Sequence, residues 1–322
     1  MIATITTLDP VMESLRQVEE LLKAQVDATR SPFEAALAGL ISAGGKRLRP
    51  RIALLAGGAV GANPAALVNP ATAIEMLHTA TLIHDDLVDG AILRRGIETL
   101  NARWSAAASV LVGDLAFTRA AALIHSTHSL PAIEMFTRTM ALMVEGEVSQ
   151  LAREDRLSSR EDYFHWISAK TAALFELAAG APALLSLAGE SAFAAARRFG
   201  YGIGMAFQIV DDVLDFTGDP ARLGKPVGND LRQGTLTLPA LIYREDHPLD
   251  PDLGKILRRE SLEEPALRGL IERICRSVAI DRSLQTASGF VREALEDLAC
   301  LPESPERFAL AEIALEIVER QA

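Results

Sequence analysis

The stretch Asp85-Asp86-Leu87-Val88-Asp89 recurs later in the chain as Asp211-Asp212-Val213-Leu214-Asp215, and each copy ends an apolar run with a glycine soon after it. On a helix, residues i and i+4 lie about 40° apart around the axis, so the outer aspartates of each copy share one face. Both copies are expected at C-terminal helix ends, where the helix dipole makes each carboxylate unfavourable by about 0.3–1 kcal/mol.

These two segments, the first aspartate cluster (85–89) and the second aspartate cluster (211–215), predict a divalent cation. Carboxylates gathered at a helix end repel one another and need a counter-charge. Sites built only from oxygen favour Mg²⁺, which keeps several waters and takes substrate phosphates as further ligands. Solvated acidic helix ends would explain one such cluster, whereas two clusters in matching apolar frames favour a magnesium site.

Composition restricts the class of protein. The chain has 322 residues, of which 49% are hydrophobic, 23% charged and 5% aromatic. This length is ample for a large core, and the shortage of aromatic residues favours helix over strand. The net charge of −11 argues against a nucleic-acid partner, because no overall positive field attracts phosphate backbones. Cys275 and Cys300 are expected to be reduced thiols of a cytoplasmic protein, with a disulfide as the open alternative.

Apolar residues recur at helical spacing in nearly every segment, which predicts an all-α bundle of ten or more helices in a single domain over residues 1–322. Helices are expected over about 15–26, after Ser31-Pro32, after Gly44-Gly45 and from about Pro70 to Asp89. No β-hairpin signal and no phosphate-binding glycine loop is present. The two aspartate clusters are expected to face each other across a central cavity, as in bundles that hold metals.

The longest uncharged stretch, residues 52–74, is long enough to span a bilayer. The pairs Asn63-Pro64 and Asn69-Pro70 break it, so we expect two buried helices joined by a turn. No transmembrane segment is therefore predicted, while surface association with a membrane stays open.

Two basic segments complement the aspartate clusters. Gly44-Gly45-Lys46-Arg47-Leu48-Arg49-Pro50-Arg51 places four cations behind a glycine pair that lets the backbone turn tightly. Arg94-Arg95-Gly96 follows the first aspartate cluster, and arginine forks bind phosphate oxygens in a bidentate manner. Each segment alone would also suit a charged surface turn. Together with the clusters they predict two anionic substrates, one held through Mg²⁺ and one held by cations.

In this order the motifs resemble those of the trans-isoprenyl diphosphate synthases, the polyprenyl synthetase family. The matching segments cover most of residues 40–241 and are GGKRLRP (44–50), MLHTATLIHDDLVDGAILRRG (76–96), LVGD (111–114), GEVSQL (146–151), KTAALFELA (170–178), FQIVDDVLDFTGD (207–219) and GKPVGNDLRQGTLTLPAL (224–241). The resemblance implies an isoprenoid synthase-type helical bundle and head-to-tail condensation. An allylic diphosphate ionises, the double bond of isopentenyl diphosphate attacks the carbocation, and loss of a proton leaves a product one isoprene unit longer.

The resemblance also implies roles for individual residues. About three Mg²⁺ ions would be held at the two clusters, through Asp85, Asp89 and Asp211, with Asp86, Asp212 and Asp215 in supporting or water-mediated positions. The substrate-binding residues would be Lys46, Arg49, His78 and Arg95 for isopentenyl diphosphate, and Arg94, Lys170 and Lys225 for the allylic diphosphate. Thr171 and Gln208 would place oxygen dipoles near the developing cation. Thr235 stands where many family members carry a lysine, so one cation for the allylic diphosphate is missing.

Product length is expected to depend on Ala80, Thr81 and Leu77, which precede Asp85 by about one to two helical turns. Short-chain relatives carry bulky aromatic residues at the fourth or fifth position before this cluster, whereas Thr81 and Ala80 are small. The resemblance therefore implies an all-trans polyprenyl product of about C30–C50, as for a quinone side chain.

Two alternatives stay open. A geranylgeranyl (C20) diphosphate synthase would share every catalytic residue and differ only in the depth of its product tunnel. A non-catalytic regulatory subunit of a heteromeric synthase is the alternative from another class, although such subunits lose the aspartate clusters. The resemblance further implies a homodimer, with peripheral membrane contact through the product.

Overall fold

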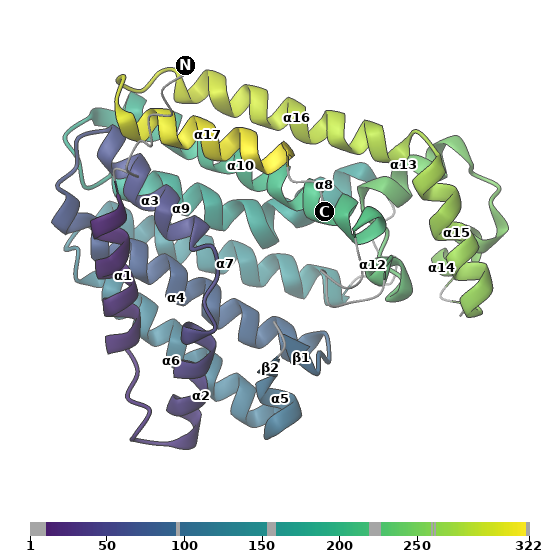
Figure 1. Cartoon of the computed structure of the whole chain (residues 1–322), viewed down its shortest axis with the longest axis horizontal. Helices are drawn as coiled ribbons and strands as arrows, with labels where there is room; N and C mark the ends of the chain where they lie inside the picture. The colour runs from purple at the N-terminus through teal and green to yellow at the C-terminus, as the bar shows by residue number, and fades with distance from the viewer. Residues whose placement is uncertain are drawn as a thin grey trace, which may run out of the picture. The chain divides into compact units, whose positions relative to one another are not determined.

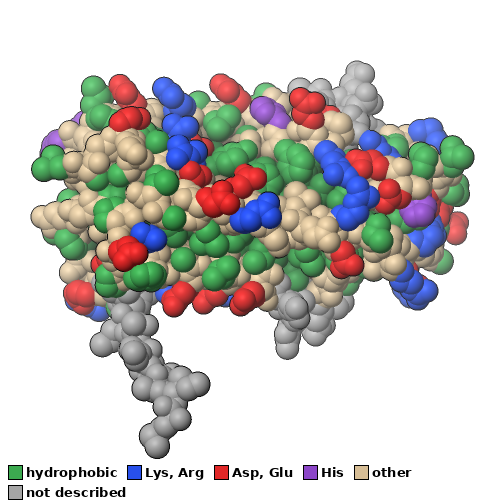
Figure 2. All heavy atoms as spheres, turned by 90° about the horizontal axis from the view of Figure 1, so that it is seen from above, with side chains coloured by type: hydrophobic (Ala, Val, Ile, Leu, Met, Phe, Trp, Pro, Cys, Tyr) green, Lys and Arg blue, Asp and Glu red, His purple; other side chains and the backbone are tan. Residues whose placement is uncertain are grey.

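The computed structural model describes residues 11–94, 97–152, 159–218, 227–258, 260 and 262–319. Figure 1 shows that these residues are helical almost throughout, and strand within them is confined to one two-stranded sheet. The predicted all-α class, with more than ten helices, is therefore confirmed. Acidic and basic side chains are interspersed on the face that Figure 2 presents.

The chain divides into two compact units that interleave along the sequence. The first unit comprises the described parts of Met1–Arg138, Leu174–Arg197 and Leu298–Ala311, and the second those of Thr139–Ala173, Arg198–Asp297 and Glu312–Ala322. Among the helices that run from one unit into the other are α7 (Leu130–Ala152), α10 (Gly189–Thr217), α16 (Ala279–Leu298) and α17 (Pro305–Glu319).

The first unit is built around α4, the helix that carries the first aspartate cluster. Besides parts of the shared helices, its elements are α1 (Met12–Ala24), α2 (Pro32–Ser42), α3 (Leu48–Ala59), α4 (Pro64–Val88), β1 (Leu93–Arg94), β2 (Ile97–Glu98), α5 (Leu100–Arg103), α6 (Ala106–His125) and α9 (Ala173–Ala183). Helix α4 packs against α1, α3, α5 and α6 (Figure 1). Its side chains Ile74, Leu77 and Ala80 are fully buried, so this helix forms much of the unit's core.

Both ends of α4 follow from local sequence. Asn63 caps the start, because its side-chain oxygen accepts the Ala65 amide at 3.1 Å, and Pro64 takes the first helical position. At the other end Gly90 adopts φ +63°, which a glycine reaches without steric cost. The Gly90 amide then bonds to the Leu87 carbonyl and the Ala91 amide to the Asp86 carbonyl. This is a Schellman motif, and it ends the helix at the predicted place.

The start of α4 differs from the prediction. Pro70 was expected to begin this helix, but α4 starts at Pro64 and continues through Pro70. A proline removes one intrahelical hydrogen bond, which isolated helices tolerate poorly. Here the surrounding residues Leu67, Val68, Ala71 and Thr72 are buried, so tertiary packing compensates for the loss. The two buried helices predicted within 52–74 are otherwise confirmed as α3 and the first turns of α4.

No hairpin was predicted, yet β1 and β2 form a short antiparallel pair with Leu93 opposite Glu98 and Arg94 opposite Ile97. Strands of two residues are too short to show the alternation that predicts a strand, which explains the omission. The pair follows the first aspartate cluster directly and carries Arg94.

The second unit carries the second aspartate cluster near the end of α10. Besides the shared helices, its elements are α8 (Arg160–Ile167), the π-helix η1 (Ser168–Ala172), α12 (Asn229–Arg232), α13 (Leu238–Asp246), α14 (Pro251–Leu257) and α15 (Glu264–Arg276). Within this unit α10 and α16 approach closely, because a Cβ at Gly202 would lie 2.9 Å from the Ala294 side chain.

Helix α6, 20 residues long, is the one helix among the described residues that is long and apolar enough to cross a membrane, with a mean hydropathy of 1.6 in its most apolar window. Buried core helices meet the same criterion. Helix α6 packs along α4, and Gly113 lies so close to it that a Cβ there would meet the His84 ring at 2.1 Å.

Candidate functional site

The first aspartate cluster lies in the last turn of α4 and at its C-cap. Asp85 is half-buried and Asp89 exposed, whereas Asp86 is only 5% exposed. The Asp89 amide donates to the Asp85 carbonyl at 2.8 Å, so the two aspartates are one turn apart on the same side, as predicted. Asp85 and Asp89 therefore have the accessibility that a metal site requires, and Asp86 does not.

Asp86 instead pairs with Arg94 of β1. The Arg94 Nε donates to Asp86 Oδ1 at 2.6 Å, and the Arg94 side chain is 31% exposed. Burial raises the pKa of Asp86, while the Arg94 charge works against that rise. The β-hairpin thus holds a predicted substrate-binding arginine beside the first aspartate cluster.

The basic segment 44–51 divides its cations between two tasks. Lys46 is exposed, as a substrate-binding residue would be. Arg47 is buried at the start of α3 and donates to Glu19 Oε1 at 2.5 Å, Glu75 Oε1 at 2.8 Å and the Ile41 carbonyl at 2.6 Å. Arg47 therefore ties α1, α2 and α4 together and serves the fold.

Arg49 and His78, both predicted to bind isopentenyl diphosphate, lie side by side. The Arg49 Nη1 is 3.2 Å from His78 Nε2, and the guanidinium carbon lies 4.6 Å above the centre of the Phe175 ring. A small cavity of about 30 Å³ is lined by His78, Arg94 and Asp86 among others. The first unit thus brings Arg49 to His78, and His78 lines one cavity with Arg94.

The second aspartate cluster occupies the last two turns of α10. Asp211 is exposed, while Asp212 and Asp215 are 3% and 1% exposed. Asp215 Oδ2 accepts the Asp230 amide at 3.1 Å, and the Asp215 carbonyl accepts the Gly228 amide at 2.7 Å. Asp215 thereby connects α10 with the start of α12, a contact that the sequence pattern did not reveal.

Asp212 is held by a chain of side-chain hydrogen bonds. The Tyr163 hydroxyl donates to Asp212 Oδ2 at 2.6 Å, and the Gln208 amide donates to Asp212 Oδ1 at 2.8 Å. The Thr171 hydroxyl donates to Gln208 Oε1 at 2.7 Å. Burial, followed by the charges of Asp230 and Asp211, raises the pKa of Asp212 well above its ordinary value, and the two donated bonds oppose that rise. The structure thus joins Thr171 to Gln208 and links both, through Asp212, to Tyr163.

Lys170 and Thr171 lie in η1, a π-helical turn between α8 and α9. Such turns are rare and often mark functional sites. The Lys170 Nζ lies 2.9 Å from Glu147 Oε1 and 5.5 Å from the centre of the Trp166 ring. Glu147 belongs to the GEVSQL segment, for which the sequence predicted no individual role. The structure shows that it forms an ion pair with Lys170.

The remaining predicted residues fall into two groups. Of the chain-length residues, Ala80 and Leu77 are fully buried, while Thr81 is half-buried and its hydroxyl donates to the His78 carbonyl at 2.8 Å. Arg95 and Lys225, predicted to bind substrate, lie outside the described residues.

The donor chemistry fits a hard cation. Asp85, Asp89, Asp211 and Asp215 supply oxygen alone, the ligand that Mg²⁺ prefers. Across the described residues, no group of three or more His, Cys, Asp or Glu side chains is gathered closely enough to hold a metal without other ligands. The first cluster thus offers Asp85 and Asp89, and the second offers Asp211 while Asp215 is buried. Further ligands would come from water and phosphate.

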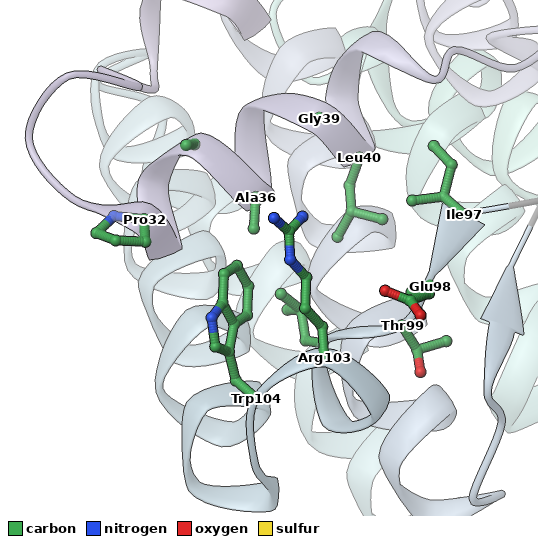
Figure 3. A pocket seen from close by; sticks show the side chains of 11 residues that line it. Pro32, Ala36, Gly39, Leu40, Ile97, Glu98, Thr99, Arg103 and Trp104 are labelled. Carbon is green, nitrogen blue, oxygen red and sulfur yellow. The ribbon is translucent and has the colours of Figure 1, made fainter.

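A cavity of about 240 Å³ elsewhere in the first unit contains none of the predicted residues. It lies between α2 and the segment of β2 and α5, and Figure 3 shows the Arg103 side chain reaching past Trp104 toward α2. The Arg103 guanidinium carbon lies 5.0 Å from the centre of the Trp104 ring, so the cation is held by its neighbour.

The polyprenyl synthetase family profile matches residues 30–274, most of the chain. Octaprenyl diphosphate synthase of Escherichia coli (strain K12) is 39% identical over 286 residues, covering 87% of this chain and 88% of the relative. Heptaprenyl diphosphate synthase component 2 of Geobacillus stearothermophilus is 34% identical over 309 residues, covering 96% of both.

Among solved structures, polyprenyl synthase from Caulobacter crescentus CB15, complexed with calcium and isoprenyl diphosphate, is similar to this chain. It is 37% identical with a TM-score of 0.89, and the match covers 97% of this chain and 96% of that one. The family profile spans more than half of the chain, and the relatives are more than 30% identical over most of both chains, so the chain belongs to the polyprenyl synthetase family.

Proposed function

We propose that this protein is a trans-polyprenyl diphosphate synthase that condenses an allylic diphosphate with isopentenyl diphosphate. The observation that carries the proposal is the pair of aspartate clusters at the C-terminal ends of α4 and α10, in which Asp89 and Asp211 are exposed and Asp85 is half-buried. Head-to-tail condensation gives an all-trans product one isoprene unit longer at each cycle. The allylic carbon–oxygen bond breaks, its electron pair leaves with the diphosphate, and a new carbon–carbon bond forms before a proton is lost.

The metal would be held by Asp85, Asp89, Asp211 and Asp215, with about three Mg²⁺ ions at the two clusters. When bound, Mg²⁺ neutralises the charge that the departing diphosphate gains. The calcium in the Caulobacter crescentus structure supports a divalent cation site in this family. Asp86 keeps Arg94 in place rather than serving as a ligand, because its buried Oδ1 already accepts the Arg94 Nε.

The diphosphates would be held by cations of this chain. Lys46, Arg49, His78 and Arg95 bind isopentenyl diphosphate in this proposal, and the 3.2 Å approach of Arg49 to His78 supports their common task. Arg94, Lys170 and Lys225 bind the allylic diphosphate. Thr171 and Gln208 present oxygen dipoles to the carbocation, where aligned dipoles lower the barrier most. Lys170, Thr171, Gln208, Asp85 and Asp211 are the proposed catalytic residues.

The proposed product is long, about C30–C50. Ala80 and Thr81 are small residues within two turns of Asp85, and Leu77 lies about one turn further from that aspartate. The octaprenyl and heptaprenyl names of the two relatives support this length and disfavour the C20 alternative. A long polyprenyl tail is an apolar chain, so brief membrane contact through the product is expected.

We further propose that the protein is a cytoplasmic homodimer that pairs through α6. Among the described residues, the outer face of this helix exposes Val110, Leu111, Ala121 and Ala122. Asp114 is exposed on the same face, at its centre. Apolar side chains around it are typical of an interface between subunits.

The test is a product assay with purified protein, Mg²⁺, farnesyl diphosphate and labelled isopentenyl diphosphate, with chain length read by chromatography. Products of about C30 or longer are expected, and removal of Mg²⁺ by a chelator is expected to abolish them. A stop at C20 would contradict the proposed length and retain the chemistry. No elongation from any primer would contradict the proposed activity of the chain alone and favour the regulatory subunit, and the name "component 2" of one relative makes that outcome informative.

A further inference from the structure

Tyr163 stands at the buried end of the hydrogen-bonded chain in the second unit, at a position to which no role has yet been given. Its side chain is fully buried, and its hydroxyl reaches Asp212 Oδ2 at 2.6 Å from a position 49 residues away in the sequence. The chain continues from Asp212 Oδ1 to the Gln208 amide and from Gln208 Oε1 to the Thr171 hydroxyl. One tyrosine is thus linked to both residues proposed to face the carbocation.

The direction of each hydrogen bond follows from the chemistry of the groups. Both oxygens of Asp212 accept, one from Tyr163 and one from Gln208. With Asp212 as a carboxylate, the Gln208 NH₂ group faces it, because the reverse orientation would place Gln208 Oε1 at 2.8 Å from another acceptor. Gln208 Oε1 is then directed at Thr171, whose only proton is used in the bond between them. The Thr171 oxygen can offer lone pairs alone to anything else that approaches it.

We propose that Tyr163 is a positioning residue that fixes Asp212, and through it the orientation of Gln208 and Thr171, so that this pair presents only oxygen lone pairs to the allylic carbocation. The inference rests on the proposed function and adds a residue to it. Oxygen lone pairs stabilise a cation by their electrostatic field, whereas an O–H or N–H pointed the same way would oppose it. In this proposal, Tyr163 prevents the Gln208 amide and the Thr171 hydroxyl from taking that second orientation.

Burial explains why a tyrosine performs this task rather than water. Asp212 is 3% exposed, and the negative charges of Asp211 and Asp230 act on it. Its two oxygens need donors that cannot exchange away. The centre of the Tyr163 ring lies 5.4 Å from that of Phe164, which in turn lies 6.1 Å from that of Phe290 of α16. The tyrosine ring therefore belongs to an aromatic cluster.

The test replaces Tyr163 by Phe, which removes the hydroxyl and keeps the ring. Tyr163→Phe is expected to lower kcat for elongation about tenfold, with KM for isopentenyl diphosphate within about twofold of wild type, because the lost interaction acts in the transition state. Tyr243→Phe is the matched control: that residue is also buried in the second unit and donates to an aspartate, Asp250 Oδ2, at 3.0 Å. Its kcat is expected to stay within about twofold of wild type. Equal kcat values in the two variants would overturn the inference.

A double-mutant cycle separates positioning from general structural support. In a Gln208→Leu background the hydrogen-bonded chain from Tyr163 to Thr171 is already broken. Adding Tyr163→Phe there is expected to change kcat by less than about twofold. Full additivity of the two changes would overturn the inference, since a merely structural tyrosine acts independently of Gln208. If Tyr163→Phe fails to fold, Asp212→Asn keeps the tyrosine and leaves one acceptor for two donors. We expect about the same tenfold loss of kcat in Asp212→Asn, and an unchanged kcat would contradict the positioning role of Tyr163.

The wild-type assay is read first. Absence of any elongation by the wild-type protein contradicts the proposed function and the role of Tyr163 with it, whereas wild-type elongation combined with an unaffected Tyr163→Phe contradicts the positioning role alone.

Discussion

At the scale of single residues, neighbouring cations of one motif have different tasks. Lys46, Arg47 and Arg49 look alike in the sequence, but Lys46 is exposed, Arg47 is buried against Glu19 and Glu75, and Arg49 meets His78. Arg47 also takes φ +45°, a left-handed conformation uncommon outside glycine. Its three acceptors hold it there, so this residue fixes the turn from which its neighbours project.

Arg47→Lys tests this division of roles. A lysine carries one compact ammonium and cannot reproduce the planar fork that reaches Glu19, Glu75 and the Ile41 carbonyl. We expect a loss of about 2–3 kcal/mol in the free energy of unfolding, measured by urea denaturation, because a buried carboxylate is left poorly paired. Lys46→Ala is the control, with a stability change below about 0.5 kcal/mol and a raised KM for isopentenyl diphosphate. Equal stability of both variants would contradict the structural role of Arg47.

At the scale of elements, two helices end in the same aspartate pattern but are terminated differently. Gly90 closes α4 with a Schellman motif, whereas α10 is followed by the contact of Asp215 with the Asp230 amide of α12. Asp85 and Asp89 consequently stay accessible at the end of α4, while of the outer aspartates in α10 only Asp211 is exposed. Equal sequence motifs therefore give unequal sites.

The face of α4 is expected to set product length, and Ala80→Phe tests it. Ala80 lies about 7.5 Å along the helix axis from Asp85, at 1.5 Å per residue. A phenylalanine there is expected to shorten the product to about C15–C20 by filling the space beside the growing chain. Chain length is read by chromatography. Ala71→Phe is the matched control, since Ala71 is equally buried and lies on the opposite side of α4. Both substitutions overpack the core, so a shorter product from both, or from neither, would contradict the tunnel assignment.

Helix α14 offers a test of stability against pH. Its N-cap, Asp250, accepts the amides of Asp252 and Leu253 at 3.0 and 3.1 Å and pairs with Arg273. Burial works to raise the pKa of Asp250, but the Leu253 amide, Tyr243, Arg273 and the Asp252 amide together lower it below its usual 3.8. A lowered folded-state pKa means that the stabilisation is present above the unfolded value and is lost as the pH falls through the folded one.

We therefore expect Asp250→Ala to lower the free energy of unfolding by about 1 kcal/mol at pH 7, as for the loss of an N-cap. The difference from wild type is expected to shrink as the pH falls below the ordinary carboxylate value of 3.8, because the wild-type carboxylate then takes up a proton. Urea denaturation at pH 7 and over the acidic range measures it. Asp246→Ala, which removes a surface pair with Arg282, is the control and should change stability by less than about 0.5 kcal/mol. A pH-independent difference for Asp250→Ala would contradict this account.

At the scale of the whole molecule, the two aspartate clusters belong to different compact units that the chain enters more than once. The family profile, over residues 30–274, includes parts of both units. The prediction of a single domain over residues 1–322 stays a prediction. The same holds for the homodimer, for which the outer face of α6 provides the test.

Leu111→Glu places a charge on that face, at a side chain that is 67% exposed. If α6 forms the dimer interface, a buried and unpaired carboxylate would shift the protein toward monomer, measured by analytical ultracentrifugation at two concentrations. Leu249→Glu is the control, since that side chain is 93% exposed in the turn between α13 and α14 and lies on no helix face. A dimer that persists in Leu111→Glu would refute the α6 interface.

The sequence by itself determined the helical class, the end of α4 and the family. These features depend on local signals: apolar spacing, the capping Asn63 and the glycine at position 90. Each acts over a few residues, so its effect can be predicted from the sequence. The aspartate clusters were found for the same reason, because a helix brings residues i and i+4 to one face without help from distant segments.

Only the tertiary structure decided which charged groups are buried and what they contact. Pro70 is tolerated because the helix around it is packed, Arg47 is structural because Glu19 and Glu75 surround it, and Tyr163 reaches Asp212 from another helix. The π-helical turn that carries Lys170 and Thr171 likewise had no sequence signal. The free energy of each of these arrangements depends on burial and on partners far away in the sequence, and no local pattern contains that information.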